Sequence, residues 1–194
     1  MLHLTEDTTM ATSSSTQRSA ENVVGAAESV QQETPRLRAA APADLGAVET
    51  LLTASDLPLD GVRDALPTFV VAESGTDLVG VAGLEVCCEN ALLRSVAVRP
   101  EWRSHGIGRA LVTRVISDAE SRGIRALYLL TTTADRYFPS FGFRTITRDE
   151  VPADVRETAE FREACPASAT VMCRGCAGPQ VRESASPPLP ARDS

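Results

Sequence analysis

The chain has 194 residues, a hydrophobic fraction of 43% and a net charge of −7. This length allows one domain of ordinary size with tails, and no apolar run approaches the ~20 residues of a membrane span. The acidic charge argues against nucleic acid as the main partner, because neutralising phosphates requires a basic surface.

The two ends of the chain differ in composition from its middle. Residues 1–34 are rich in Ser, Thr, Glu and Gln, and residues 177–194 are rich in Pro, so we expect both segments to be disordered. The first residues lack a basic region followed by an apolar one, which predicts that the protein stays in the cytoplasm. The five cysteines should then be reduced thiols. The ordered domain is expected to span residues 35–176.

Between these ends, apolar patterns and turn residues predict a mixed sheet flanked by helices. The expected strands are Arg36–Ala40, Phe69–Glu73, Leu78–Val86, Ala91–Val98, Ala126–Thr131, a strand ending at Thr147, and Ala169–Cys173. Short turns make the second, third and fourth of these antiparallel neighbours. The fifth is a nearly continuous apolar run, which is typical of a central strand covered on both faces. The fold class is therefore α/β.

Helix signals alternate with these strands. Pro and Asp in a first turn favour a helix start, and Gly after the last apolar residue favours its end. The expected helices are one that opens at Pro42–Leu45, a short one at Asp60–Leu66 closed by Pro67, one after a glycine turn that runs to about Arg122, a short one at Ala134–Ser140, and one that starts at Val151–Asp154.

The strongest functional signal is the turn Arg103–Arg109, which joins an apolar strand to a periodic helix. Gly106 and Gly108 let the backbone approach an anion with no Cβ in the way. The N–H groups at a helix start and the helix dipole point at one spot, so the turn predicts a diphosphate site. The alternative is a tight strand-to-helix connection without a ligand. Pro100 and the arginines on both sides of the turn favour the anion site.

Two motifs resemble those of a known family. Residues 98–111, V-x-P-x-x-R-x-x-G-I-G-R-A-L, resemble the acetyl-CoA signature of the GCN5-related N-acetyltransferase (GNAT) superfamily. Residues 134–143, A-x-x-Y-F-x-x-x-G-F, resemble its second motif. Within the superfamily the chain is most similar to the N-acetyltransferases associated with arsenic-resistance operons. That similarity rests on Leu92–Val98, Tyr128–Thr133 and Cys165–Ala169.

The resemblance implies a GNAT-type acyl-CoA N-acyltransferase fold, with a mostly antiparallel sheet, for an N-acetyltransferase domain at residues 35–176. It also implies acetyl-CoA as co-substrate and no enzyme nucleophile. The backbone of Val96, Ala97 and Val98 would pair with the pantetheine arm, and an N–H near Val98 would polarise the thioester carbonyl. The N–H groups of Ser104, His105, Gly106, Ile107, Gly108 and Arg109 would hold the diphosphate, and Arg103 is a further implied cofactor-binding residue.

The motifs leave the catalytic acid and base open. The position of the family's usual acid holds Phe138, which cannot protonate a thiolate, so Tyr137 beside it is the candidate acid; a simply packed tyrosine is the alternative. The strand before the glycine turn offers no Glu at the usual place. Glu85 on the neighbouring strand is therefore the candidate base, directly or through a water, against the alternative of a solvated carboxylate.

Arg94 alternates with Val96 and Val98 along its strand, so we expect it on their face. There its guanidinium could clamp a substrate carboxylate by a bidentate contact. The alternative is an ion pair with Glu85 or Glu73. Thr131–Thr133, at the end of the central strand, either line the cleft or cap the next helix.

Cys173 and Cys176 have the spacing of half a zinc site, but no second pair or nearby His completes it, so we expect no metal. The resemblance to arsenic-resistance enzymes adds the hypothesis that these two cysteines and Cys165 bind trivalent arsenic.

The predicted function is that of an acyltransferase for groups other than amino-acyl groups. It would acetylate the amine of a small, amino-acid-like acceptor, in arsenic or toxin resistance. The expected partner is this small-molecule amine, with no nucleic acid and no membrane, and a homodimer is compatible with the sequence. Two alternatives stay open: a non-catalytic regulatory module that binds acetyl-CoA or a metalloid, and a protein N-terminal acetyltransferase.

Overall fold

The computed structural model describes residues 34–164 and 168–176. Within them, seven strands form one sheet in the order β1-β2-β3-β4-β5-β7-β6. They are β1 (Arg36–Ala39), β2 (Val70–Ser74), β3 (Asp77–Cys87), β4 (Asn90–Val98), β5 (Ala126–Thr131), β6 (Arg144–Ile146) and β7 (Thr170–Arg174). The described helices are α1 (Leu45–Ala54), α2 (Val62–Ala65), α3 (Ile107–Ser121) and α4 (Ala153–Arg156). The predicted disordered segments, except residue 34, and Cys165 lie outside the described residues.

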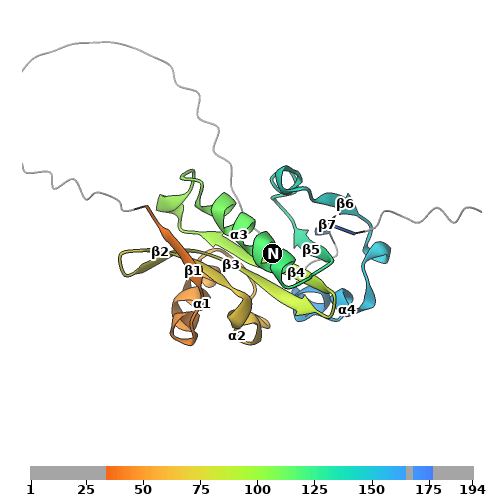
Figure 1. The fold of residues 1–194 in the computed structure, drawn as a ribbon, viewed down its shortest axis with the longest axis horizontal. Coiled ribbons are helices and arrows are strands. Elements are labelled where there is room, and N and C mark those ends of the chain that lie inside the picture. The colour runs from red at the N-terminus through yellow and green to blue at the C-terminus, as the bar shows by residue number, and fades with distance from the viewer. Residues whose placement is uncertain (1–33, 165–167, 177–194) are drawn as a thin grey trace, which may run out of the picture.

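The sheet is mixed and mostly antiparallel, as expected: β4 and β5 pair in parallel, and the other described pairings are antiparallel. Helices cover both of its faces (Figure 1). On one face, α3 buries its apolar side against β4 in a single core cluster. On the other face, α1 and α2 pack over one part of the sheet and α4 over another, in two further clusters. The predicted α/β fold is confirmed.

A β-bulge interrupts β4 and changes which way its side chains point. The register with β3 pairs Val81 with Ala97 but Gly83 with Arg94, so β4 holds one extra residue there. Ser95 in this stretch has φ +57°, which breaks the regular pleat. Leu93 and Val96 therefore both join the cluster under α3. The expectation that Arg94 shares the face of Val96 and Val98 is wrong, because the bulge shifts the alternation by one residue.

Two expected helices also differ from the structure. Residues 134–137 are not helical, and only a 3₁₀ turn, Phe138–Phe141, follows them. Pro139 lies in this turn and cannot donate the backbone hydrogen bond that a longer helix needs. Pro67 does not close α2 but lies inside a second 3₁₀ turn, Leu66–Thr68.

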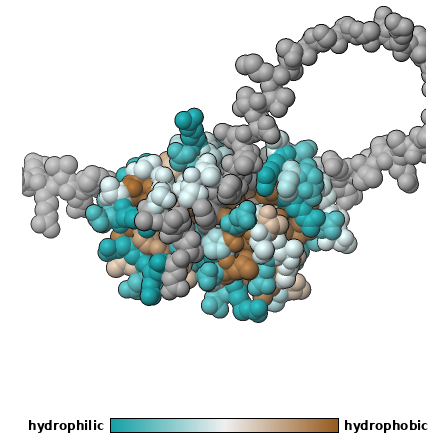
Figure 2. All heavy atoms as spheres, turned by 180° about the vertical axis from the view of Figure 1, so that it is seen from behind, coloured by the Kyte–Doolittle hydropathy of each residue, from teal (hydrophilic) through white to brown (hydrophobic). Residues whose placement is uncertain are grey.

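Few large hydrophobic side chains are exposed in the described part of the chain. On the face seen in Figure 2, hydrophobic side chains form separate patches among hydrophilic ones. Leu59 and Val86 are the large hydrophobic residues that stay exposed in the described part of the chain, at 41% and 45%. None of the helices described there has the length and apolar character needed to cross a membrane.

Candidate functional site

The parallel strands β4 and β5 pair along only part of their length. Within the described residues their register joins Asn90, Ala91 and Leu92 to the first half of β5. Beyond Leu92 the described register gives β4 no partner on this side, up to Val98. A backbone edge of this kind offers N–H and C=O groups to an extended ligand, as a further strand would.

The turn that follows this edge is shaped by specific local contacts. A 3₁₀ turn at Pro100–Trp102 ends the strand, and Arg103 then donates from Nε to the carbonyl of Val98 at 3.2 Å. Ser104 and Gly106 have φ of +63° and +77°, and Gly106 caps the start of α3. Positive φ at these two positions turns the chain so that α3 can begin with its first N–H groups in front of the turn. This geometry is that of an anion site.

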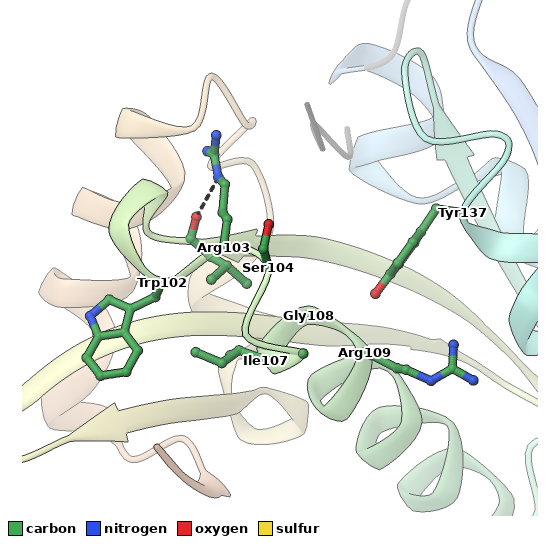
Figure 3. Close-up of a pocket in the computed structure, with 9 residues that line it drawn as sticks. Trp102, Arg103, Ser104, Ile107, Gly108, Arg109 and Tyr137 are labelled. Carbon is green, nitrogen blue, oxygen red and sulfur yellow. Dashed lines mark hydrogen bonds between the residues drawn. The ribbon is translucent and has the colours of Figure 1, made fainter. Parts of the chain in front are cut away.

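A cavity of about 180 Å³ lies in front of this turn (Figure 3). It brings together most of the predicted cofactor residues from the end of β4, the turn and the start of α3. Its lining residues are Val98, Trp102, Arg103, Ser104, Gly106, Ile107, Gly108, Arg109 and Tyr137. Val96 and Ala97 lie further back in β4, fully or almost fully buried. His105 is exposed on the turn and does not line the cavity; its Nδ1 lies 2.7 Å from the carbonyl oxygen of Arg103.

Tyr137 and Phe138 point in different directions. Phe138 is fully buried in the core under α3. Tyr137 reaches toward the start of α3 from the opposite side of the cavity to Trp102 and Arg103 (Figure 3). Burial raises the pKa of the Tyr137 phenol above its ordinary value, with Arg109 opposing the shift. The phenol therefore keeps its proton at neutral pH and can act as a donor into this cavity.

Arg94 and Glu85 meet on the opposite face of the sheet. Nη1 of Arg94 donates to Oε2 of Glu85 at 2.7 Å, and the Arg94 side chain is fully buried. This is the ion pair that the sequence left open as an alternative to a substrate clamp. Glu85 also lines a second cavity, of about 350 Å³, together with residues of α2 and Ala159.

Glu160 is a buried charged residue that the sequence analysis missed. It is 1% exposed, and its Oε2 lies 3.1 Å from Nε of Arg94. It begins a π-helical turn, Glu160–Ala164, which is a rare form that often occurs at functional sites. No local pattern marks it, because its partner lies 66 positions earlier in the chain.

The cysteines and threonines differ from some expectations. Cys173 and Cys176 form a disulfide, so the prediction of reduced thiols is wrong for this pair. Cys87 is a free thiol whose pKa is raised to about 12, mainly by burial.

No cluster of three or more His, Cys, Asp or Glu side chains suited to a metal occurs in the described part of the chain. The hydroxyl of Thr131 accepts a hydrogen bond from the Ala134 N–H at 2.9 Å; this bond closes a turn after β5 and caps no helix, because residues 134–137 are not helical.

Comparison with known proteins adds a family match and several relatives. Residues 66–145 match the family model described as an acetyltransferase (GNAT) domain. An amino-acid acetyltransferase of Aeromonas salmonicida is 29% identical over 136 residues, which are 64% of this chain and 30% of that protein. A mycothiol acetyltransferase of Thermobifida fusca is 42% identical over 57 residues, 29% of this chain and 18% of that protein. The chain thus spans less than a third of these relatives.

Solved structures resemble the domain more completely. A Mycobacterium tuberculosis protein in complex with CoA aligns with a TM-score of 0.63 and 26% identity, over 72% of this chain and 98% of that one. The N-acetylglutamate synthase of Neisseria gonorrhoeae, complexed with coenzyme A and N-acetyl-glutamate, aligns with a TM-score of 0.64 and 23% identity. That match covers 74% of this chain and 35% of the synthase.

Proposed function

We propose that this chain, which carries a GNAT acetyltransferase domain and has the GNAT fold, transfers an acetyl group from acetyl-CoA to the amine of a small, amino-acid-like acceptor. One observation carries the proposal: the unpaired edge of β4 leads directly into the anion turn before α3, with a cavity in front of both. The solved structure in complex with CoA and the relatives named amino-acid acetyltransferases support the choice of co-substrate and acceptor.

The residues present fit acetyl-CoA. The turn combines N–H groups at a helix start with positive φ at Ser104 and Gly106, which suits a diphosphate. A Cβ on Gly108 would lie 3.4 Å from the Tyr137 hydroxyl and 3.7 Å from Val98, inside the space that a ligand would need. Acetyl-CoA supplies an activated acyl group, so no covalent enzyme intermediate is needed.

In the proposed mechanism the β4 edge and the turn hold the co-substrate in line with the acceptor. A backbone N–H near Val98 stabilises the charge that develops on the thioester oxygen. Glu85 lines the second cavity, on the other face of the sheet, so in this scheme the acceptor amine approaches from that side and loses its proton to Glu85, directly or through a water. Tyr137 donates a proton to the sulfur as the carbon–sulfur bond breaks. The products are the acetylated amine and CoA.

The structure bears on the role of Arg94 in acceptor binding. Its guanidinium is buried and already bonded to Glu85 and to the carbonyl of Asp60. For Arg94 to clamp a substrate carboxylate, at least one of these contacts would have to open. The substrate clamp thus stays a prediction, and an acceptor carboxylate requires either this exchange or another donor.

The narrower predictions add a biological setting. Acetylation of an amino-acid-like arsenical in arsenic resistance rests on sequence similarity alone. The disulfide between Cys173 and Cys176 removes two of the three thiols proposed for arsenite, as long as it is intact. Location in the cytoplasm and assembly as a homodimer also stay predictions.

A thiol-release assay tests the proposed function. Purified protein is mixed with acetyl-CoA and a panel of L-amino acids and amino-acid-like arsenicals, and free CoA thiol is followed over time. We expect acceptor-dependent thiol release with at least one member of the panel. Acetyl-CoA binding in calorimetry without turnover on any amine would favour the non-catalytic module instead. Turnover only with peptides that have a free N-terminus would favour a protein N-terminal acetyltransferase.

A further inference from the structure

Three segments far apart in the sequence meet at one buried guanidinium. Arg94 of β4 donates to Oε2 of Glu85 in β3 and to the carbonyl of Asp60, which lies before α2. On its other side, Nε donates to the Ser95 hydroxyl at 3.3 Å and forms an ion pair with Glu160, whose Oε2 lies 3.1 Å away. The Arg94 side chain is fully buried, so these groups replace the water that a charged guanidinium would otherwise bind.

The two carboxylates at this guanidinium are not equivalent. The Glu160 side chain is 1% exposed and sealed in the interior, whereas the Glu85 side chain is 22% exposed and lines the 350 Å³ cavity. One positive and two negative side chains give the cluster a formal charge of −1. Only the Glu85 end can meet a ligand.

The geometry of the guanidinium links the two ends. Its N–H groups form a rigid planar fork, so the hydrogen bond to Ser95 and the ion pair with Glu160 on the Nε side determine where the Nη1 donor points. The backbone of Gly61 covers the cluster closely, because a Cβ there would lie 3.0 Å from Nη1 of Arg94. The Arg94 side chain therefore has little room to turn. Its Nη1 donor, which contacts Glu85, is fixed by the contacts on the Nε side.

We propose that Arg94 and Glu160 are positioning residues for Glu85. Glu160 anchors the guanidinium, the guanidinium holds one oxygen of Glu85, and the second oxygen of Glu85 stays available to the acceptor amine. The proposal rests on the proposed function, in which Glu85 is the base. In this proposal Arg94 does not contact the substrate itself but acts on it through Glu85.

Steady-state kinetics in two backgrounds test this proposal. Glu160→Gln removes the anchoring charge with little change in shape, and Glu85→Gln removes the base. We expect Glu160→Gln to lower kcat on the order of 10-fold to 100-fold, because misplaced catalytic groups cost rate, with KM for acetyl-CoA unchanged. In the Glu85→Gln background the same substitution should change kcat by less than about twofold, because the two residues act as one unit. Asp118→Asn, on an exposed ion pair of α3, is the matched control.

A second pair of variants keeps the test valid if Glu160→Gln folds poorly. Gly61 and Gly123 have nearly equal φ, +73° and +74°, but a Cβ meets Arg94 only at Gly61 and open space at Gly123. Gly61→Ala and Gly123→Ala therefore carry similar backbone strain, and only the first displaces the guanidinium. We expect Gly61→Ala to lower kcat and Gly123→Ala to leave it unchanged. In the Glu85→Gln background, Gly61→Ala should have no further effect on kcat.

The outcomes separate this proposal from the proposed function. An equal loss of kcat from Glu160→Gln with and without Glu85 would overturn it, as would an effect of Gly123→Ala as large as that of Gly61→Ala. Crystal structures of the unmodified protein and of Glu160→Gln give a readout without turnover. A Glu85 carboxylate that stays in place in the variant overturns the positioning role, and one that moves supports it. Absence of turnover in the unmodified protein on every amine overturns the proposed function alone.

Discussion

The hydroxyl of Tyr137 lies 3.4 Å from the point that a Cβ atom on Gly108 would occupy. One residue belongs to the segment after β5 and the other to the first turn of α3, so the cavity between them is bounded from two sides. A side chain at position 108 would therefore take up space in this cavity.

Gly108→Ala should weaken acetyl-CoA binding without weakening the fold. The added methyl group enters the cavity, and we expect the Kd to rise roughly 10-fold, about 1.4 kcal/mol. Alanine favours a helix over glycine by about 1 kcal/mol, so stability should not fall. Isothermal calorimetry measures the affinity. Gly46→Ala is the control, because a Cβ there meets nothing within 4 Å. Equal affinity of both variants would contradict the placement of the ligand.

Tyr137→Phe should lower kcat by up to about 10²-fold and leave KM for acetyl-CoA nearly unchanged, because only the proton donor is lost. Burial raises the pKa of Tyr137, so its phenol holds its proton to a higher pH than a free tyrosine. In the unmodified protein, the fall of kcat at alkaline pH that loss of the Tyr137 proton causes should thus lie above about pH 10. That fall should disappear in the variant.

Tyr128→Phe provides the matched control for this experiment. Tyr128 is the only other tyrosine, and it is buried in a different core cluster and does not line the cavity. Its loss should leave kcat and the pH profile unchanged. A similar effect of both substitutions would mean that Tyr137 acts through packing.

Asp44→Asn should lower the free energy of unfolding by about 0.5–1 kcal/mol at neutral pH. Arg38 contacts both oxygens of Asp44, at 2.6 and 2.9 Å, and these hydrogen bonds lower the pKa of Asp44. A lowered folded-state pKa stabilises the fold above the unfolded pKa of about 4, and this stability is lost as the pH falls through the folded value. Solvent screening keeps the effect small.

Urea unfolding at about pH 7 and about pH 2.5 measures this difference. The gap between Asp44→Asn and the unmodified protein should shrink at the lower pH, where the carboxylate becomes protonated. A gap that stays constant with pH would show that the charge of Asp44 does not contribute.

Gly83→Ala should destabilise the protein by about 1–3 kcal/mol or more, through overpacking. A Cβ at this position would lie 2.0 Å from the Phe69 ring, which is 1% exposed and cannot move aside. Urea unfolding provides the measurement, with Gly46→Ala again as the control. Adding Phe69→Leu should restore part of the lost stability. If it restores none, the clash is not the cause.

Much of the fold follows from local signals in the sequence. The strands β2, β3, β4 and β5 fall within one or two residues of their predicted bounds, because apolar alternation and short turns act over neighbouring residues. The turn before α3 is equally local, since Pro100 ends the strand and Gly106 supplies a positive φ. Pro139 is a local signal too. It lies in the 3₁₀ turn Phe138–Phe141, which replaces the helix predicted at 134–140.

The sequence by itself thus determined the strand, the glycine turn and the helix of the proposed cofactor half, because each depends on residues next to it in the chain. Only the tertiary structure decided what Arg94 contacts. A bulge at Ser95 changes the face of every later residue in β4, and it arises from the register with β3. The contact with Glu160 joins residues 66 positions apart and requires the whole sheet to be assembled. The proposed acceptor half of the site therefore depends on long-range packing that no local pattern encodes.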